Sequence, residues 1–299
     1  MPVQAARRSG APGWHDQCLR RGRYRTVTEH IARGAADVRR LAADSTDLGD
    51  LDARMVECRA CPRLVSWREQ VARTPRASFA GERYWGRPVP GFGSAQASIA
   101  VVGLAPAAHG GNRTGRVFTG DRSGDWLYAA LFRAGLANQP TSVAADDGLQ
   151  VRRLRVNAVV RCAPPANKPT PVERDTCRPW LQRELQILLP TLRVVVVLGG
   201  FGWTALWPAL AACGPPVPKP RPVFGHGTEV ALPGLTVLGC YHVSQQNTFT
   251  GRLTEAMLDA VFTRAIALAG DAAGVSVGDS AGAAAGDLAG DLADDAARL

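Results

Sequence analysis

The sequence predicts a three-layer α/β/α fold with a central, mostly parallel sheet of four strands. Four short runs are continuously apolar and rich in Val and Leu, as strands buried on both faces of a parallel sheet are. Longer segments with helical periodicity lie between or after these runs, so strand and crossover helix alternate along the chain. Because the carboxyl ends of such strands gather at one edge of the sheet, we expect the functional residues at that edge.

The predicted strands cover residues 98–105, 154–162, 193–200 and 235–242. The predicted helices cover residues 125–134, 172–189, 203–211 and 253–268. The segments that follow the strands are rich in Gly, Pro, amide side chains or His, and few of their residues are typical of a core. The sequence therefore places these residues, which are typical of binding loops, at the edge where this fold binds ligands.

Three regions are predicted along the chain. Residues 1–45 are Arg-rich and weakly periodic, which indicates an N-terminal arm or a short helical segment around residues 26–43. Residues 46–270 are predicted to form the main folded domain. Residues 271–299 consist mostly of Ala, Gly and Asp and contain no aromatic residue, a composition typical of a disordered tail.

The charge of the chain predicts a polyanionic partner. Without the last 29 residues, 34 Lys and Arg face 20 Asp and Glu, and nearly all the cations are Arg. The planar guanidinium suits phosphate, although a GC-rich genome would also raise the Arg content. No apolar run reaches the roughly 20 residues that span a bilayer, and the first residues do not resemble a signal peptide. We expect a cytoplasmic monomer that does not bind membranes.

Four of the seven cysteines are spaced in a way that predicts a metal centre. Cys58 and Cys61 form a C-x-x-C pair, and Cys162 and Cys177 follow about a hundred residues later. Zinc modules usually close their four ligands within a few dozen residues, whereas an iron–sulfur cluster can pin a helix to a domain that already folds. Zinc, or ordinary buried thiols at Cys162 and Cys177, remain alternatives. The other three cysteines, Cys18, Cys213 and Cys240, do not fit the pattern.

The loop from Gly103 to Asp121, GLAPAAHGGNRTGRVFTGD, joins the first predicted strand to a helix. Its glycines permit close approach of the backbone to a ligand. The loop lacks the Lys of a phosphate-binding P-loop, which argues against NTP hydrolysis. Phe118 stands in a polar context, where a flat ring can stack on a planar base.

Three segments of the chain, residues 103–124, 157–165 and 242–247, resemble the motifs of the family 5 (type B) uracil-DNA glycosylases, and the four cysteines match the cluster spacing of that family. The resemblance covers roughly residues 51–270. It implies a uracil-DNA glycosylase fold and a structural 4Fe-4S cluster held by the four paired cysteines. It also implies excision of uracil and of other bases, such as hypoxanthine, hydroxymethyluracil or ethenocytosine, from single- or double-stranded DNA, which leaves an abasic site.

The reaction requires that a nucleotide leave the base stack and that charge on both base and sugar be stabilised. We expect Phe118 to stack on the base, in a pocket formed with Gly103 and Ala105. The resemblance implies that Asn157 reads the pyrimidine edge, because an amide matches both N3–H and O4. Asn157 could instead be an ordinary strand-end amide, and Asn167 is a second candidate for the same role.

Two residues are predicted to act on the reacting bond. A neutral His242 would donate a hydrogen bond to uracil O2, and Asp121, the nearest acid in the loop, would orient water or offset positive charge on the sugar. Asp121 could alternatively serve only as a helix cap. His109 is a candidate for contact with sugar or phosphate. The segment after His242, with Gln246 and Arg252, suits a wedge that contacts DNA, although it could be a plain loop.

Two rival functions remain open at this point. The first is an iron–sulfur protein that binds nucleic acid without cutting it, which the basic core and the missing acid in the first half of the loop favour. The second is a redox protein that uses the cluster for electron transfer. Formation of abasic sites in uracil-containing DNA would separate both from a glycosylase.

Overall fold

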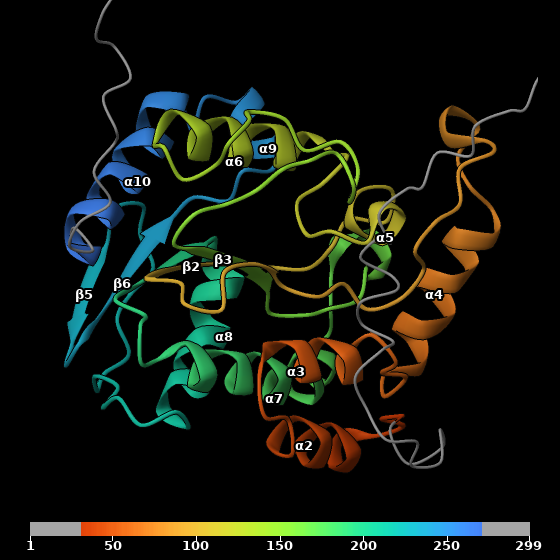
Figure 1. Cartoon of the computed structure of the whole chain (residues 1–299), viewed down its shortest axis with the longest axis horizontal. Helices are drawn as coiled ribbons and strands as arrows, with labels where there is room; N and C mark the ends of the chain where they lie inside the picture. The colour runs from red at the N-terminus through yellow and green to blue at the C-terminus, as the bar shows by residue number, and fades with distance from the viewer. Residues whose placement is uncertain (1–30, 271–299) are drawn as a thin grey trace, which may run out of the picture. The chain divides into compact units, whose positions relative to one another are not determined.

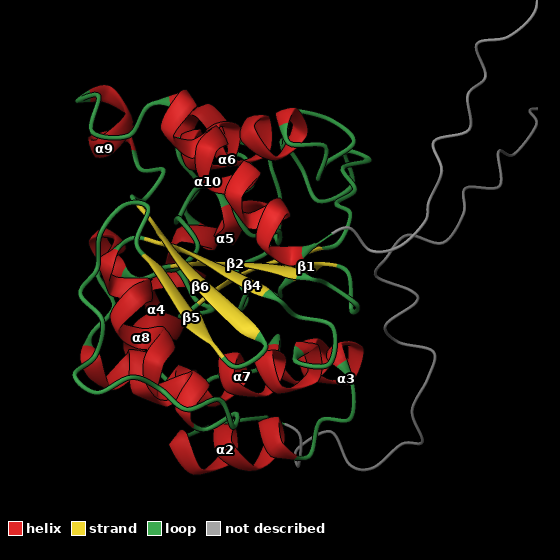
Figure 2. Ribbon diagram, turned by 90° about the vertical axis from the view of Figure 1, so that its left-hand side faces the viewer, coloured by secondary structure: helices red, strands yellow, loops and turns green. Residues whose placement is uncertain are grey.

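The computed structural model describes residues 31–270, in which six strands form one sheet in the order β1-β3-β2-β4-β6-β5. The strands are β1 (Phe92–Gly93), β2 (Ile99–Gly103), β3 (Leu154–Ala158), β4 (Val194–Leu198), β5 (Glu229–Leu232) and β6 (Leu235–Cys240). The four central strands are mutually parallel, and β1 and β5 are antiparallel edge strands (Figure 2). The predicted α/β fold and its four parallel strands are confirmed.

The sequence missed both edge strands for physical reasons. Strand β1 has two residues, too few to form a pattern. Strand β5 alternates exposed and half-buried residues, so it lacks the continuous apolar run that marks the central strands. The sheet therefore has six strands where four were predicted.

Helices cover both faces of the sheet. The α-helices of the described residues are α2 (Ala35–Ala43), α3 (Leu48–Met55), α4 (Pro62–Arg73), α5 (Gly111–Thr114), α6 (Arg122–Arg133), α7 (Pro171–Leu188), α8 (Gly200–Ala211), α9 (Gln245–Phe249) and α10 (Glu255–Ala269). Helices α6 and α10 lie on one face, α7 and α8 lie on the other, and α2 and α3 lie outside α7 (Figure 1). Short 3₁₀ turns, η2 (Ala77–Phe79) and η3 (Pro165–Asn167), connect other elements.

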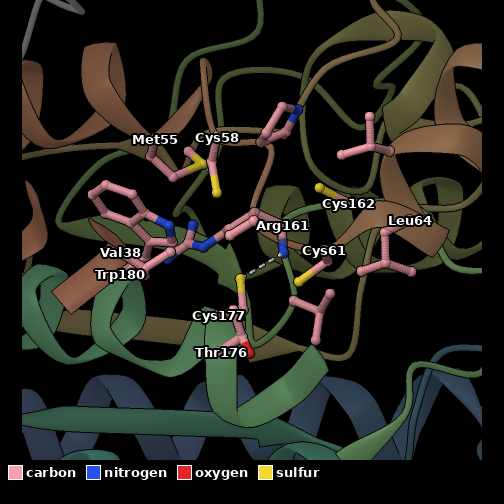
Figure 3. Close-up of a pocket in the computed structure, with 14 residues that line it drawn as sticks. Val38, Met55, Cys58, Cys61, Leu64, Arg161, Cys162, Thr176, Cys177 and Trp180 are labelled. Atoms are coloured by element: carbon pink, nitrogen blue, oxygen red, sulfur yellow. Dashed lines mark hydrogen bonds between the residues drawn. The ribbon is translucent and has the colours of Figure 1, made fainter. Parts of the chain in front are cut away.

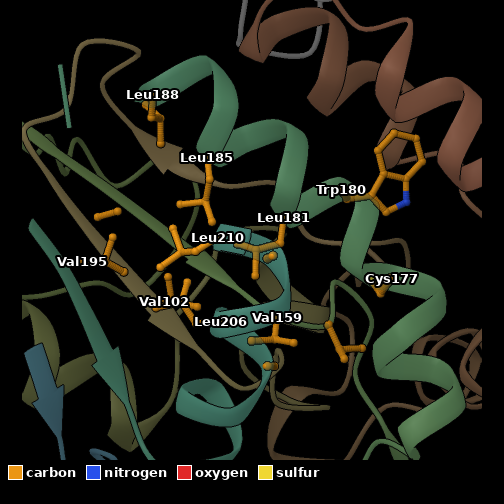
Figure 4. Packing of buried hydrophobic residues seen from close by; sticks show 14 of the residues in the cluster. Val102, Val159, Cys177, Trp180, Leu181, Leu185, Leu188, Val195, Leu206 and Leu210 are labelled. Atoms are coloured by element: carbon orange, nitrogen blue, oxygen red, sulfur yellow. The ribbon is translucent and has the colours of Figure 1, made fainter. Parts of the chain in front are cut away.

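The core is formed by alternate residues of each strand. Val102 and Val195 face the layer of α7 and α8, where Leu185 and Leu206 pack against them (Figure 4). The alternate residues of the same strands pack against α6 and α10 on the other face. Burial of both sheet faces explains why most residues of the central strands are apolar.

The N-terminal boundary differs from the one that the sequence predicts. Helix α2 lies within the predicted arm of residues 1–45, yet Val38 and Leu41 are fully buried and the helix packs against α7. Residues 31–45 therefore belong to the folded domain, because their apolar side chains complete its core. The rest of the arm, with Cys18, and the predicted tail over residues 271–299 lie outside the described residues.

Among the described residues, no helix is both long and apolar enough to cross a membrane.

The carboxyl ends of the parallel strands lie at one edge, and each is followed by a polar segment that leads to a helix. The long loop after β2 reaches α6, the Pro-rich loop after β3 reaches α7, and β6 leads directly to α9. This edge is where the sequence places the functional residues.

Candidate active site

The loop after β2 brings an aromatic ring onto the end of that strand. A Cβ on Gly103 would lie 2.5 Å from Cζ of Phe118, so the glycine is what allows the ring to pack there. Phe118 itself has a φ of 51°, a conformation that is rare and costly for a bulky residue. Gly124 in α6 makes room for the carbonyl of Phe118. Ala105, whose small side chain is half-buried, follows in the same loop.

A buried ion pair holds the Phe118 turn in place. The guanidinium of Arg116 donates to the hydroxyl of Thr119 at 2.9 Å, to Ser142 at 2.9 Å and to Asp147 at 2.7 Å. Both charged side chains are largely buried. Hydrogen bonds from Arg116 and from backbone N–H groups lower the pKa of Asp147 to about 2, against the opposing effect of burial. The strained turn is therefore tied to the segment around residue 147.

Asn157 is a buried amide without partners. It is fully buried on β3, and neither its amide nitrogen nor its amide oxygen makes a hydrogen bond within the described protein. Asn157 directly precedes Ala158, which pairs with Gly103, so it lies at the strand ends beside the Phe118 turn. A buried amide normally has partners, and its lack of them indicates that a ligand supplies them. Asn167, the alternative, is exposed on η3.

His242 follows β6 at the same edge. Its ring centroid lies 6.2 Å from that of Phe118, and Gly199, at the end of β4, makes room for its Cβ. Burial lowers the pKa of His242 to about 4, so the imidazole is neutral at physiological pH. The side chain of Asn247 donates to the carbonyl of His242 at 2.8 Å and fixes the backbone there. A neutral imidazole in this position can donate one hydrogen bond.

Asp121 is the helix cap that the sequence offered as one of two alternatives, and its second oxygen faces the loop. Its Oδ1 accepts a hydrogen bond from the N–H of Gly124 at 3.0 Å and caps α6. Its Oδ2 lies against Gly110, where even a methyl group would collide with it. Burial raises the pKa of Asp121, partly offset by the hydrogen bonds from the backbone of residues 124 and 123. The cap therefore fixes the carboxylate and leaves its second oxygen at the glycine-rich loop.

His109 directly precedes Gly110, against which the carboxylate of Asp121 packs, and aromatic neighbours hold its ring. Its Nδ1 lies 3.0 Å from the hydroxyl of Tyr84, and its ring stacks on Phe79 with centroids 6.3 Å apart. Burial, followed by the charges of Arg76 and Arg113, lowers the pKa of His109. His109 is therefore neutral at physiological pH, and a nearby cation opposes its protonation.

The segment after His242 forms the short helix α9 where a polar loop was predicted. Gln246 is exposed on α9, and Arg252 follows it, with its guanidinium 4.6 Å from the ring centroid of Tyr241. Phe249 at the end of α9 is 68% exposed, an unusual position for a large apolar ring. These side chains face solvent beside the site, as contact with DNA would require.

The four paired cysteines line one cavity although they come from different parts of the chain. Cys58 follows α3, Cys61 caps α4, Cys162 follows β3 and Cys177 lies on α7, and Figure 3 shows their thiols around a common space. Cys213 and Cys240 do not line this cavity. The predicted grouping of the four cysteines is therefore what the structure shows.

Two N–H donors point at these sulfur atoms. Arg68, which is buried on α4, donates to Sγ of Cys162 at 2.9 Å and to the carbonyl of Cys58 at 3.0 Å. The backbone N–H of Arg161 lies 3.4 Å from Sγ of Cys177 (Figure 3). Such donors commonly surround thiolate-bound iron, where they compensate negative charge on sulfur.

The chemistry of this cavity fits a metal centre that is bound by thiolates. Burial raises the pKa of Cys61 to about 12 and that of Cys162 to about 11, so the thiolates need a compensating positive group. A bound iron–sulfur cluster or metal ion would supply that charge. Within residues 31–270, no three His, Cys, Asp or Glu side chains are grouped to hold one metal ion.

Comparisons with known proteins identify the family of the chain. Residues 90–265 match the model of the uracil DNA glycosylase superfamily. The chain is 57% identical over 231 residues to a type-5 uracil-DNA glycosylase of Mycobacterium bovis, which covers 77% of this chain and 85% of that protein. The chain belongs to the type-5 uracil-DNA glycosylases. Proteins of that name from Mycobacterium leprae (55% over 233 residues) and Thermus thermophilus (52% over 217 residues) match 77% and 72% of this chain and 99% and 95% of their own lengths.

The resemblance stated from three motifs is thereby confirmed, and the structure adds supporting residues of this type-5 glycosylase that the sequence did not reveal. Arg68 holds the cysteine cavity, Asn112 connects Arg68 to the loop, and Asp147 anchors the Phe118 turn. Asn112 donates from its amide to the carbonyls of Arg68 at 3.2 Å and Ala108 at 3.4 Å. The residue types alone could not have identified these contacts, because each pairs positions far apart in the chain.

Proposed function

We propose that this protein excises uracil from DNA by hydrolysing the N-glycosidic bond, which leaves an abasic site. One observation carries the proposal: the amide of Asn157 is fully buried without a partner in the described protein, and the residue directly precedes the strand end that the Phe118 turn covers. A flipped uracil offers both a flat face for stacking and an edge that an amide can read. The names of the type-5 relatives support the same activity.

In the proposed reaction, water adds to C1′ of the deoxyribose while the bond from C1′ to N1 of the base breaks. The electron pair of that bond goes to the base, and the sugar passes through a positively charged state. A proton from the water leaves through a carboxylate or the departing base, so the products are free uracil and an abasic sugar. A catalyst must therefore stabilise negative charge on the base and positive charge on the sugar.

His242 and Asn157 are proposed to act on the base. Because the imidazole of His242 is neutral, it can donate a hydrogen bond to O2 as negative charge develops, without holding the charge of an imidazolium. The amide of Asn157 would donate to O4 and accept from N3–H, which satisfies both of its unpaired atoms. Phe118 would stack on the ring.

Asp121 is proposed to act on the sugar side. Its capping bond to Gly124 fixes the side chain, and Oδ2 remains at Gly110. From there the carboxylate would orient water and offset positive charge on the sugar. It is the acid of the loop from Gly103 to Asp121, since the first half of that loop contains none.

The alanine-rich half of the loop supports tolerance for other bases. Ala105 and Ala107 are half-buried and small, so they leave room around the base that larger residues would fill. We therefore extend the proposal to hypoxanthine, hydroxymethyluracil and ethenocytosine, in single- and double-stranded DNA. Excision rates on oligonucleotides that carry each lesion would rank them.

A 4Fe-4S cluster is proposed for the cysteine cavity. Cys58, Cys61, Cys162 and Cys177 would hold it, and when bound it would supply structural cross-linking rather than a chemical step. These four residues join α4 to the end of β3 and to α7, the strand and helix that frame the site. Iron and sulfide analysis should give four irons per chain, and Cys162→Ser should lose the iron and much of the soluble protein. One zinc per chain would contradict the assignment.

The test of the function is single-turnover excision on a uracil-containing oligonucleotide, followed by alkali cleavage at abasic sites. The wild-type protein should produce alkali-labile sites, and Asp121→Asn should lower the rate at least about tenfold while binding of DNA persists. Asn can still accept the capping bond, so the variant separates the proposed chemistry from the helix cap. Binding of uracil-containing DNA without any abasic sites would instead favour the non-catalytic alternative.

A further inference from the structure

The segment between α4 and β1 crosses the loop of the candidate site. The N–H of Trp85 donates to the carbonyl of Arg113 at 2.9 Å, and the N–H of Gly86 donates to that of Asn112 at 3.0 Å. Figure 1 shows this segment turning beside α5, at the end of the sheet where the parallel strands finish. Residues 76–84 are therefore attached to the active-site loop although they precede it by some thirty residues.

The outer side of this segment is positively charged. Arg76 and Arg83 are exposed, and no ion pair of either side chain is described in residues 31–270. The acid of the segment, Glu82, is already bound by Arg113 at 2.6 Å, so it is not available to neutralise them. Arg87, by contrast, is paired with Glu57. Two cations therefore remain for a partner.

Aromatic contacts fix the segment in position before any partner binds. The guanidinium of Arg113 lies 4.1 Å from the ring centroid of Phe79, and Phe79 stacks on His109. Tyr84 completes the attachment through its hydroxyl, which lies 3.0 Å from Nδ1 of His109. Because the segment is already held in place, binding of a partner here would cost little conformational entropy of the protein backbone.

The charged segment also lies next to the proposed chemistry. The charge of Arg76 contributes to the lowered pKa of His109, so the two side chains interact. His109 is followed by Gly110, against which Oδ2 of Asp121 packs. A sugar placed at Asp121 would therefore have its adjoining phosphates close to the side of the molecule that carries Arg76.

We propose that Arg76 and Arg83 form a surface that binds the phosphate backbone of the damaged DNA strand on one side of the extruded nucleotide. Gln246 and Arg252, on and after α9, lie at a different part of the same edge and would contact another part of the duplex. The contacts are to phosphate, so they set position and affinity without reading sequence. The inference rests on the proposed function for its identification of DNA as the partner.

The experiment measures affinity for a duplex that carries an uncleavable abasic-site analogue, over a series of salt concentrations. The double variant Arg76→Ala/Arg83→Ala should reduce the slope of log K against log salt by about 0.9 for each arginine that contacts phosphate. Between 50 and 200 mM salt this amounts to about a threefold smaller loss of affinity for each contact. Arg76→Lys/Arg83→Lys should restore the slope, because lysine retains the charge.

The matched control is Arg152→Ala/Arg193→Ala, which removes two exposed arginines just before β3 and β4, at the opposite edge of the sheet. This control should keep the wild-type slope and excision rate. If the Arg76 and Arg83 variant has the slope of the control, the inference is wrong even when the wild-type protein excises uracil. If the slope falls as expected in a protein that makes no abasic sites, the surface stands and the proposed activity fails.

Discussion

Replacing Asn157 with Leu should stabilise the free protein and disable it. The two side chains have similar size and shape, and the site of Asn157 is fully buried on β3. Leu removes two buried polar atoms that have no partner in the described protein. The substitution therefore separates the stability of the fold from the recognition of the base, which most core changes do not.

The magnitude follows from the cost of unpaired buried groups. Each such group costs about 1–3 kcal/mol, and part of the gain is offset by differences in branching, so we expect a net stabilisation of about 1–3 kcal/mol. For a domain of this size that is a rise in Tm of about 2–4 °C for each kcal/mol. Loss of a preorganised hydrogen-bonding group in a site typically lowers the rate about 10²–10³-fold, and we expect a loss of that order in single-turnover excision.

Thermal unfolding measures the expected gain in stability, and single-turnover excision on the same preparations measures the expected loss of activity. Asn167→Gly is the comparison variant, because Asn167 is exposed with a φ of 55° that glycine adopts without strain. It should keep activity, since Asn157 and not Asn167 is proposed to read the base. A clear fall in Tm for Asn157→Leu would show that its amide has partners after all, and an unchanged excision rate would remove Asn157 from the proposed site.

Three further predictions follow from buried groups. The pKa of His242 is about 4 in the folded protein and 6.5 for a free imidazole, so the unfolded chain takes up a proton first as the pH falls. Stability should drop between about pH 6.5 and 4 by up to about 3 kcal/mol, and urea unfolding of His242→Gln should lack that dependence. Asp147→Asn breaks the pair with Arg116 and should lower the free energy of unfolding in denaturant by about 3–5 kcal/mol, and it should also lower the excision rate. An unchanged excision rate would show that this ion pair is not needed to position Phe118. Arg68→Met removes a cation and a donor from Cys162, so the reduction potential of the proposed iron–sulfur centre should become more negative in a spectroscopic titration. An unaltered potential would contradict a role of this contact at the proposed centre.

The central part of the fold could be predicted because each parallel strand is recognisable from its own run of apolar residues. Strands β2, β3, β4 and β6 are buried on both faces, so most of their residues are apolar, and the crossover helices between them are long enough to show a period. The edge strands lack such signals, and the sequence indicated helix α2 only as an alternative, a short helical segment around residues 26–43. Helix α2 has only nine residues, and its place against α7 is set by tertiary packing that no local pattern records.

The residues of the candidate site likewise fall into two groups, those that were predicted from the sequence and those that were not. Phe118, Asn157 and His242 were predicted from the family resemblance and from their segments at or after the strand ends, and the structure places all three residues at that edge of the sheet. The residues that hold them could not be named. Arg116 reaches Asp147 across 31 positions, and Arg68 reaches Cys162 across 94. Arginine is common throughout this chain, so residue type gave no means of separating these two buried guanidinium groups from the many that face solvent.

The structure shows that the two roles considered for Asp121, a helix cap and a part in the reaction, do not exclude each other. From the sequence, the residue either caps a helix or serves the reaction. A carboxylate has two oxygens, and here Oδ1 accepts the capping bond from Gly124 while Oδ2 meets Gly110 in the loop. The cap restricts the rotamer, and a restricted rotamer is what a group that orients water requires. Capping of α6 is therefore compatible with the proposed role of Asp121, because one carboxylate can serve both.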